Sequence, residues 1–319
     1  MKILANDGIS AVGKEKLEAH GFTVVTDKVD QNALADTINN EGYVALLVRS
    51  ATTARKELID ACPGLKFIGR GGVGMDNIDV DYAREKGLKV QNTPAASSDS
   101  VGELVMGHLY SCARHLHDSN RQMPESGNTE FKVLKKKYAK GVELAGKTLG
   151  VVGIGRIGQA TAKRAIGVGM RVIVTDPYAQ VSEISLHIHG VGEVKAPVEQ
   201  VEMDELLAQS DFITLHVPKQ DDGSAVIGAD EIKKMKDGAS IVNAARGGVV
   251  DEDALMAALD AGKLRYAALD VFENEPTPRE DVLKHKKIAL TPHIGAATGE
   301  AQDRIGLELA DHLIQYFKG

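Results

Sequence analysis

Short apolar runs rich in β-branched residues alternate along the chain with longer segments that have helical periodicity. This alternation is typical of parallel sheets whose strands are joined by helices, and it predicts an α/β fold. A first set of strands is expected at residues 2–5, 22–26, 44–48, 66–69 and 88–91, with helices at 10–20 and 31–40. A second set is expected at residues 148–152, 171–176, 212–216, 239–243, 266–271 and 288–291.

Two further helical segments link and complete these sets. A helix over about residues 98–117, with Asp99 and Ser100 as capping candidates, is expected to connect them. The tail from 297 to 317 is also helical in pattern. Because one helix cannot form a core of its own, we expect the tail to pack on the first sheet, which otherwise has too few helices.

Composition narrows the class of protein. The chain has 319 residues, 43% hydrophobic and 26% charged, which is ordinary for a two-domain globular enzyme. A net charge of −7, the absence of Trp and an aromatic content of 4% disfavour nucleic-acid binding. No signal-peptide core or stretch of about 20 uncharged apolar residues occurs. With two cysteines, Cys62 and Cys112, in segments expected to be buried, a cytoplasmic protein without disulfides is predicted.

A glycine motif follows the predicted strand 148–152. It contains Gly153, Gly155, Arg156, Ile157 and Gly158 and opens a helix, and the next strand ends in Asp176. These are the parts of a dinucleotide site: glycines for a tight turn and close approach, helix N–H groups for a pyrophosphate, and an acid for the ribose. The acid should repel a 2′-phosphate, so the expected cofactor is NAD rather than NADP. The alternative is a glycine-rich turn with no cofactor.

Four loops after the second-set strands carry polar residues suited to chemistry. Parallel strand ends meet at one sheet edge, so these loops should face the nicotinamide end of the cofactor. Hydride transfer at a carbinol also requires proton transfer and a cation for an acidic substrate, and Arg, His and Glu are suitable types. The cofactor-facing candidates are His216, Val217, Pro218, Ala244, Arg246, Asp270, His293 and Gly295. The other histidines, His108, His115, His117, His187 and His189, lack metal-ligand spacing, so no metal site is predicted.

Several motifs together resemble the D-2-hydroxyacid dehydrogenase family, and within it the phosphoglycerate dehydrogenases: residues 69–79, 92–94, 153–158, 243–247, 270–276 and 291–295. The resemblance implies a flavodoxin-like substrate domain, 1–98 with 296–319, into which a Rossmann-type NAD domain, 99–295, is inserted. It implies that Arg246 binds the substrate carboxylate and C2 oxygen, that His293 is the acid/base and that Glu275 pairs with it. A carboxylate beside imidazole stabilises the imidazolium, which favours carbonyl reduction at neutral pH.

The resemblance also suggests that Asp270 lies near the nicotinamide carboxamide and that amides around Gly72 and Val73 receive the substrate carboxylate. A phosphorylated substrate needs a second cation, for which Arg49 and Arg70 are candidates. Lys135 could reach a neighbouring subunit's site, although relatives often carry Arg there. The residues Lys135, Lys136 and Lys137 are otherwise expected to form a solvated loop.

The reaction implied by the resemblance is NAD-dependent oxidation of D-3-phosphoglycerate to 3-phosphohydroxypyruvate, a step of serine biosynthesis. The enzymatic alternative is a hydroxypyruvate or glyoxylate reductase, and the non-enzymatic one is an NAD(H)-sensing protein similar to transcriptional corepressors. A homodimer with its contacts in residues 98–140 is expected. Because the chain ends at Gly319, an allosteric serine site is not expected.

Overall fold

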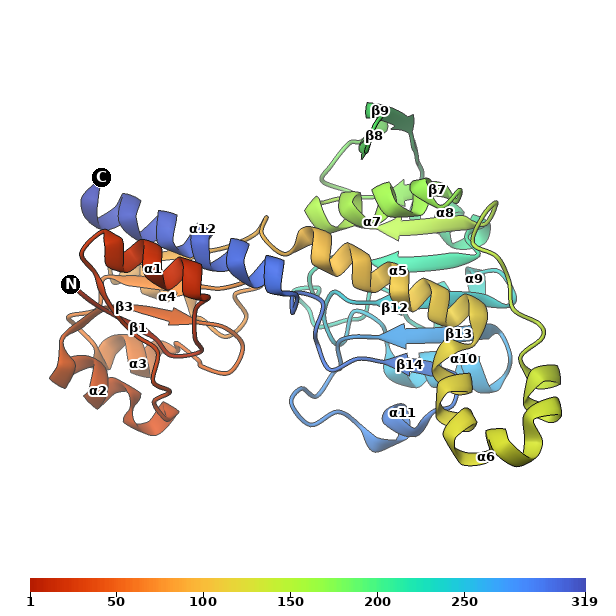
Figure 1. The fold of residues 1–319 in the computed structure, drawn as a ribbon, viewed down its shortest axis with the longest axis horizontal. Coiled ribbons are helices and arrows are strands. Elements are labelled where there is room, and N and C mark those ends of the chain that lie inside the picture. Colours follow the sequence, from red (N-terminus) through yellow and green to blue (C-terminus); the bar gives the residue numbers. More distant parts are fainter. The chain divides into compact units, whose positions relative to one another are not determined.

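Two compact units make up the chain. The computed structural model describes all 319 residues, and it divides into Met1–Ser100 with Ala296–Gly319 and Val101–Gly295. Each unit is an α/β layered structure with its own parallel sheet (Figure 1). The α/β fold class predicted from the sequence, with a Rossmann-type sheet inserted into a flavodoxin-like one, is confirmed. No helix has the combined length and apolar character that a membrane crossing requires.

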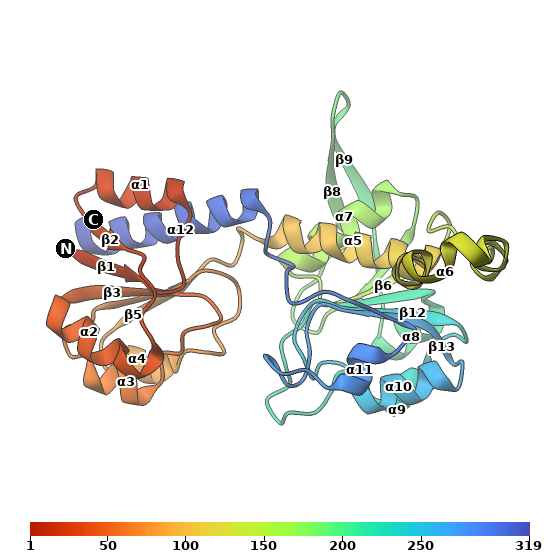
Figure 2. The same cartoon turned by 60° about the horizontal axis from the view of Figure 1, so that its bottom comes forward.

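The first unit has a five-stranded sheet with helices on both faces. The strands, in spatial order, are β2 (Thr23–Val25), β1 (Lys2–Ala5), β3 (Tyr43–Val48), β4 (Phe67–Arg70) and β5 (Lys89–Asn92). Helices α1 (Ala11–Ala19) and α12 (Gly299–Lys318) cover one face, and η1 (Gln31–Ala33), α2 (Leu34–Glu41), α3 (Lys56–Ala61) and α4 (Val80–Glu85) lie on the other (Figure 2). The strand order changes direction between β1 and β3, which is where open α/β sheets bind ligands.

Alternation along the strands explains these two layers. Ile3 and Ala5 pack with the α1 and α12 side chains, whereas Leu4 between them packs with α2 and α3. The predicted docking of the tail helix on the first sheet is therefore confirmed. Helices α1 and α12 approach closely because their contact is made by Gly13 and Gly306: a Cβ on Gly13 would lie 2.7 Å from the Gly306 carbonyl carbon.

The second unit has a seven-stranded parallel sheet. In spatial order its strands are β10 (Glu199–Gln200), β7 (Arg171–Thr175), β6 (Thr148–Val152), β11 (Phe212–Leu215), β12 (Ala239–Asn243), β13 (Leu264–Leu269) and β14 (Ile288–Leu290). Helices α5 (Ser98–Arg114) and α7 (Arg156–Gly167) pack on one face, and α8 (Met203–Gln209), α9 (Ala229–Lys234), α10 (Glu252–Asp260) and α11 (Glu280–Lys284) on the other. The strand order changes direction between β6 and β11.

The strands at 2–5, 148–152 and 239–243 occur as predicted, and the other predicted strands shift by one or two residues. The antiparallel hairpin of β8 (Glu183–Ile188) and β9 (Gly192–Pro197), visible as a projection in Figure 2, was not predicted, nor was β10. The hairpin is short, and only Ile184 and Leu186 of β8 turn into the core, which leaves a weak apolar signal.

Two local predictions are wrong. Asp99 and Ser100 do not cap the connecting helix, because α5 already begins at Ser98 and places both in its first turn. The three lysines at 135–137 do not form a loop: they end helix α6 (Leu116–Lys137). Buried Leu134 and the contacts of Asp118 with Lys137 Nζ, 3.0 Å, and Tyr138 Oη, 2.8 Å, hold this end of α6.

Candidate active site

The glycine motif forms a tight strand-to-helix turn after β6. Gly153 has φ = 89°, and a Cβ there would lie 2.6 Å from the His216 carbonyl oxygen. A Cβ on Gly158 would lie 2.1 Å from the Gly153 carbonyl oxygen, so α7 can approach β6 only with glycine at this position. At Gly155 a Cβ would meet nothing within 4 Å. The first and third glycines are thus required by the fold, and the second faces open space where a ligand could approach.

The amino terminus of α7 is suited to an anion. Gly155 is the N-cap and supplies no side-chain acceptor, so the N–H groups of the first turn at Arg156 and Ile157 have no capping partner. Because this helix end lies at the change of strand order beside β6, it is placed where a pyrophosphate binds in sheets of this order. The donor set and the open face at Gly155 fit the pyrophosphate of NAD.

Asp176 stands at the end of β7, next to this turn. One carboxylate oxygen accepts from Ile154 N at 2.8 Å, and the other accepts from Tyr178 N and Ala179 N at 2.8 and 3.0 Å. Burial opposes ionisation, yet these three backbone hydrogen bonds hold the pKa of Asp176 below its usual value. Asp176 is therefore a carboxylate at neutral pH, as a group that repels a 2′-phosphate must be.

The loop after β11 borders the same turn. His216 and Val217 contact Gly153 through the His216 carbonyl and the Val217 side chain, and Pro218 follows as an exposed residue. His216 Nε2 is 3.1 Å from Thr214 Oγ1, and burial lowers the pKa of His216 to about 3. The imidazole is neutral at physiological pH, so it adds no charge beside the cofactor turn.

His293 and Glu275 meet from two different loops. Nδ1 of His293 lies 2.7 Å from Oε2 of Glu275, and both side chains are partly exposed. The other carboxylate oxygen accepts from Phe272 N at 2.9 Å. Burial opposes ionisation of Glu275, but the bonds from His293 and Phe272 and the charge of Arg246 hold its pKa below the usual value. The pair presents the Nε2 edge of His293 away from the carboxylate.

Arg246 lies on a loop that Asn243 folds after β12. Asn243 Oδ1 accepts from Ala245 N at 3.0 Å, and its Nδ2 donates to the Arg246 carbonyl at 2.9 Å. The next residue, Gly247, must be glycine, because a Cβ there would lie 1.7 Å from the Phe272 carbonyl oxygen. This contact joins the Arg246 loop to the loop that carries Glu275, and the positive charge of Arg246 helps to hold the pKa of the Glu275 carboxyl below its usual value.

Asp270 accepts hydrogen bonds from the backbone of the loop that carries His293. Its carboxylate accepts from Thr291 Oγ1 at 2.6 Å and from the amides of Ile294 and Gly295, each at 2.9 Å. Thr291 Oγ1 is also 3.0 Å from Nε2 of His108. His293 has φ = 53°, a left-handed backbone conformation that is uncommon outside glycine. The contacts of Asp270 with Thr291 before it and with Ile294 and Gly295 after it hold this conformation. Asp270, expected beside the nicotinamide carboxamide, is already engaged by three donors in this structure.

The first unit contributes a glycine loop and two arginines at the carboxyl ends of β3 and β4. The Gly72 amide donates to Thr93 Oγ1 at 2.8 Å, so of the two amides expected to receive a carboxylate only that of Val73 makes no hydrogen bond. Gly72 has φ = 138°, and a Cβ there would lie 1.5 Å from Arg70 Nη1. Gly72 thus gives room to Arg70, and its amide is engaged by Thr93 in this structure.

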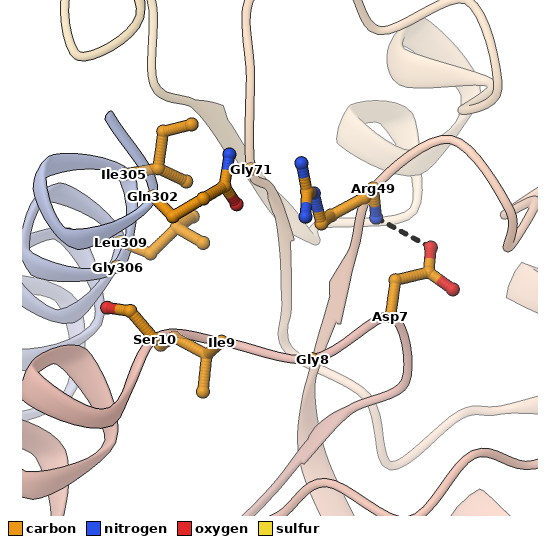
Figure 3. A pocket seen from close by; sticks show the side chains of 10 residues that line it. All are labelled: Asp7, Gly8, Ile9, Ser10, Arg49, Gly71, Gln302, Ile305, Gly306 and Leu309. Carbon is orange, nitrogen blue, oxygen red and sulfur yellow. Dashed lines mark hydrogen bonds between the residues drawn. The ribbon is translucent and has the colours of Figure 1, made fainter. Parts of the chain in front are cut away.

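Arg49 lines a cavity of about 270 Å³ in the first unit, at the change of strand order between β1 and β3 (Figure 3). Its Cγ lies 3.6 Å from the position of a Cβ on Gly71. The guanidinium is half-buried and forms no ion pair with any carboxylate of the chain. A half-buried cation without a carboxylate partner is stabilised when an anion binds beside it.

The remaining predicted site residues lie elsewhere or have structural partners. Ala244 precedes the Arg246 loop and is half-buried, and Lys135 is exposed on α6. Each unit by itself brings together part of the predicted set. In the second unit these are the cofactor turn, Arg246, Glu275, Asp270 and His293.

Sequence reasoning missed the residues that hold these groups in place. Asn243, Thr291 and His108 were not assigned a role in the site, although the first two stand inside recognised motifs. His108 and Thr291 are 183 positions apart, so no spacing rule could connect them. Only Asn243 and Thr291 could have been found from the sequence, because both lie inside the motifs at 243–247 and 291–295.

Comparison with protein families gives a match over most of the second unit. The family described as "D-isomer specific 2-hydroxyacid dehydrogenase, NAD binding domain" matches residues 106–295. The chain is 44% identical over 307 residues to the hydroxypyruvate reductase of Thermotoga maritima, which covers 95% of this chain and 92% of that protein. It is 41% identical over 321 residues to the D-3-phosphoglycerate dehydrogenase of Methanocaldococcus jannaschii, covering 100% of this chain and 58% of that one. The chain thus spans little more than half the length of the second relative.

Solved structures with the same fold cover almost the whole chain. The TT0316 protein from Thermus thermophilus superposes with a TM-score of 0.84 at 30% identity, covering 98% of this chain and 96% of that one. The NAD-dependent formate dehydrogenase from Staphylococcus aureus in complex with NAD gives a TM-score of 0.80 at 26% identity, covering 100% and 96%. Together with the fit of the α7 turn, these findings identify NAD as the cofactor of the second unit.

Proposed function

Because the chain belongs to the D-isomer-specific 2-hydroxyacid dehydrogenase family, we propose that it interconverts D-3-phosphoglycerate and 3-phosphohydroxypyruvate with NAD as the hydride carrier. The observation that supports a phosphorylated substrate is Arg49, a half-buried guanidinium with no carboxylate partner, bordering a cavity at the change of strand order of the first sheet. Such a cation is stabilised by an anionic ligand. Arg70, at the end of the neighbouring strand β4, adds a second positive charge next to the same glycine loop.

Three residues of the second unit divide the chemistry. The chemistry that NAD supplies when bound is the exchange of a hydride with C2 of the substrate. Arg246 holds the carboxylate through two parallel N–H donors and directs one donor toward the C2 oxygen. His293 takes the hydroxyl proton during oxidation and returns it during reduction. Glu275, ionised as its lowered pKa requires, fixes the imidazole tautomer and stabilises the charge that His293 acquires.

Reduction of unphosphorylated hydroxypyruvate is the second candidate. It is favoured by the 44% identity to the Thermotoga maritima hydroxypyruvate reductase, which extends over 92% of that protein. Both reactions use the same Arg246, Glu275 and His293 and differ at the distal end of the substrate, where a phosphate replaces a hydroxyl. Arg49 is therefore the residue that discriminates between the two candidates.

The experiment compares NADH oxidation with 3-phosphohydroxypyruvate, hydroxypyruvate and glyoxylate, in the wild type and in Arg49→Ala. We expect phosphohydroxypyruvate to give the highest kcat/KM, and Arg49→Ala to lower that value by about 10- to 100-fold with a much smaller effect on hydroxypyruvate. A wild type that prefers hydroxypyruvate and is insensitive to Arg49→Ala would support the second candidate. NADH binding without turnover of any substrate would support a cofactor-sensing protein.

We further propose a homodimer formed through α5 and α6 and located in the cytoplasm. Large apolar side chains of these helices are exposed, among them Tyr110, Leu116, Met123, Phe131 and Val133. Both cysteines are buried free thiols, which suits a reducing compartment. Lys135 on α6 is proposed to act in the partner's substrate site. Light scattering, which measures the molar mass in solution, tests for the dimer. Lys135→Ala should raise the KM for the phosphorylated substrate and leave the KM for hydroxypyruvate unchanged.

A further inference from the structure

The peptide groups on both sides of Arg49 are held by side chains from two other loops. The Arg49 N–H donates to Asp7 Oδ2 at 2.7 Å, and the Arg49 carbonyl accepts from Asn77 Nδ2 at 2.7 Å. Asp7 follows β1, and Asn77 lies in the segment after β4. The residue that carries the unpaired cation therefore has its backbone position determined from both neighbouring strands of the sheet.

The same two side chains also hold the far end of the Arg49 loop. Asp7 accepts from the amide and the hydroxyl of Thr52 at 3.0 and 2.7 Å, and Asn77 Nδ2 donates to the Thr52 carbonyl at 2.6 Å. The Thr52 hydroxyl in turn accepts from Asn6 Nδ2 at 2.8 Å and Lys28 Nζ at 2.9 Å. The loop from Arg49 to Thr52 is thus closed at its first and last residues by one carboxylate and one amide.

Asp7 remains charged in this position although its side chain is only 5% exposed. Burial opposes its ionisation, but Lys28, Thr52 and the two loop amides together hold the pKa of Asp7 below its usual value. Lys28 donates to Asp7 and to Thr52, so the Asp7 carboxylate already has a cationic partner other than the Arg49 guanidinium. The cation stays available to a ligand while its backbone is fixed.

We propose that Asp7 and Asn77 are positioning residues for Arg49 and set the selectivity of this protein for substrates with a distal anionic group. This inference rests on the proposed role of Arg49 in binding a phosphorylated substrate. A guanidinium recognises a phosphate through paired N–H donors whose direction must be correct, so a loop that moves loses affinity for the phosphate specifically. Asp7 lines the same cavity as Arg49, but its carboxylate oxygens accept from Lys28, Thr52 and the Arg49 amide, so the effect requires no contact of either residue with the substrate (Figure 3).

The test uses a double-mutant cycle on the full chain. Asn77→Asp keeps the size of the side chain and removes both N–H donors to the loop, and Asp7→Asn removes the charge. Each change is expected to raise the KM for 3-phosphohydroxypyruvate by about tenfold, which corresponds to the loss of one positioned hydrogen bond, with kcat and the KM for hydroxypyruvate changed by less than about twofold. In an Arg49→Ala background, the same two changes should have no further effect on either KM.

A matched control is Asp60→Asn, an exposed carboxylate of the same unit that accepts from Tyr82 Oη and pairs with Lys86. It should leave the ratio of the two KM values unchanged. Thermal unfolding of each variant separates loss of structure from loss of selectivity. If Asn77→Asp does not fold, Asn77→Ser replaces it in the same measurements.

The outcomes distinguish this inference from the proposed function. If Arg49→Ala does not discriminate between the two substrates, the proposed role of Arg49 fails. If Arg49→Ala discriminates but Asn77→Asp and Asp7→Asn do not, or if they retain their effect in the Arg49→Ala background, the positioning role is wrong while the role of Arg49 stands.

Discussion

Nδ1 of His293 and Oε2 of Glu275 are 2.7 Å apart, although the two residues lie on separate loops and are 18 positions apart. The second oxygen of Glu275 is held by the Phe272 amide, and Asp270 holds the amides that follow His293. Each member of the pair is therefore anchored by its own loop, which keeps the imidazole oriented before any substrate arrives.

Glu275→Gln tests the electrostatic part of this contact. Glutamine retains the shape of the side chain but carries no charge, so the imidazolium loses its stabilising partner. We expect the rate of carbonyl reduction at pH 7 to fall by about 10- to 100-fold. The measurement is kcat/KM with NADH for the wild type and the variant. An unchanged kcat/KM would show that Glu275 acts through its shape alone; Glu280→Gln on α11 is the surface control.

His293→Ala removes the group that exchanges the proton. Turnover should fall by about 100- to 10,000-fold, because proton transfer by a positioned side chain contributes an effect of this size. NADH affinity, measured by fluorescence titration, should change little. A comparable loss of NADH binding would instead identify His293 as a structural residue of the cofactor site.

Gly155→Ala and Gly158→Ala separate the two roles of the glycine motif. A Cβ at Gly158 collides with the Gly153 carbonyl, so Gly158→Ala should lower the Tm of the cofactor-free protein, by an amount typical of core overpacking, about 1–3 kcal/mol in stability. A Cβ at Gly155 meets no protein atom, so Gly155→Ala should preserve the Tm and weaken NADH binding. Equal behaviour of the two variants in calorimetry and NADH titration would contradict this division.

Asp176→Ala is expected to relax cofactor choice. The ionised carboxylate repels a 2′-phosphate, and its removal should raise the NADPH to NADH ratio of kcat/KM by about tenfold or more. Because Asp176 also accepts from three backbone amides, the variant should bind both cofactors more weakly than the wild type binds NADH. An unchanged ratio would mean that another group reads the ribose.

Asp7→Asn should change the acid dependence of stability. The folded-state pKa of Asp7 lies below its ordinary value of 3.8, so its ionised form adds stability at all pH above that value. This contribution is lost as the pH falls through the lower folded-state pKa. The variant should be less stable than the wild type by roughly 1–3 kcal/mol at pH 7, and the difference should shrink below about pH 4. Urea titrations at several pH values measure it; a difference that is constant down to about pH 2 would refute the assignment.

Much of the fold could be predicted because its signals are local. The β-branched strands, the glycine turn after β6 and the acid at the end of β7 depend on neighbours within one α/β unit. The β8–β9 hairpin escaped prediction because its two core residues, Ile184 and Leu186, give too short a pattern. The end of α6 escaped because three adjacent lysines remain solvated in a helix as well as in a loop, and the pairing of Asp118 with Lys137 is a tertiary contact that no local pattern shows.

The site was predicted unevenly for the same reason. Residue types and their positions after strands indicated Arg246, Asp270 and His293 as candidates. The pairing of Glu275 with His293 came from a family resemblance, since spacing alone does not join two loops. The attachment of Arg49 to Asp7 and Asn77 spans 42 and 28 positions and depends on which strands are neighbours in the sheet. Strand order is a property of the whole chain, so such contacts follow only from the folded structure.

The crossing of α1 and α12 at Gly13 and Gly306 has a consequence for synthesis of the chain. Between these helices the ribosome must produce the whole of Val101–Gly295, which can begin to fold as a separate unit. At about 5–20 residues per second, α1 waits roughly 10–60 s for its partner helix to emerge, with the apolar face of the first sheet uncovered. The first unit is thus the first to begin and the last to be completed, and the apolar side chains that α12 covers remain exposed during that interval.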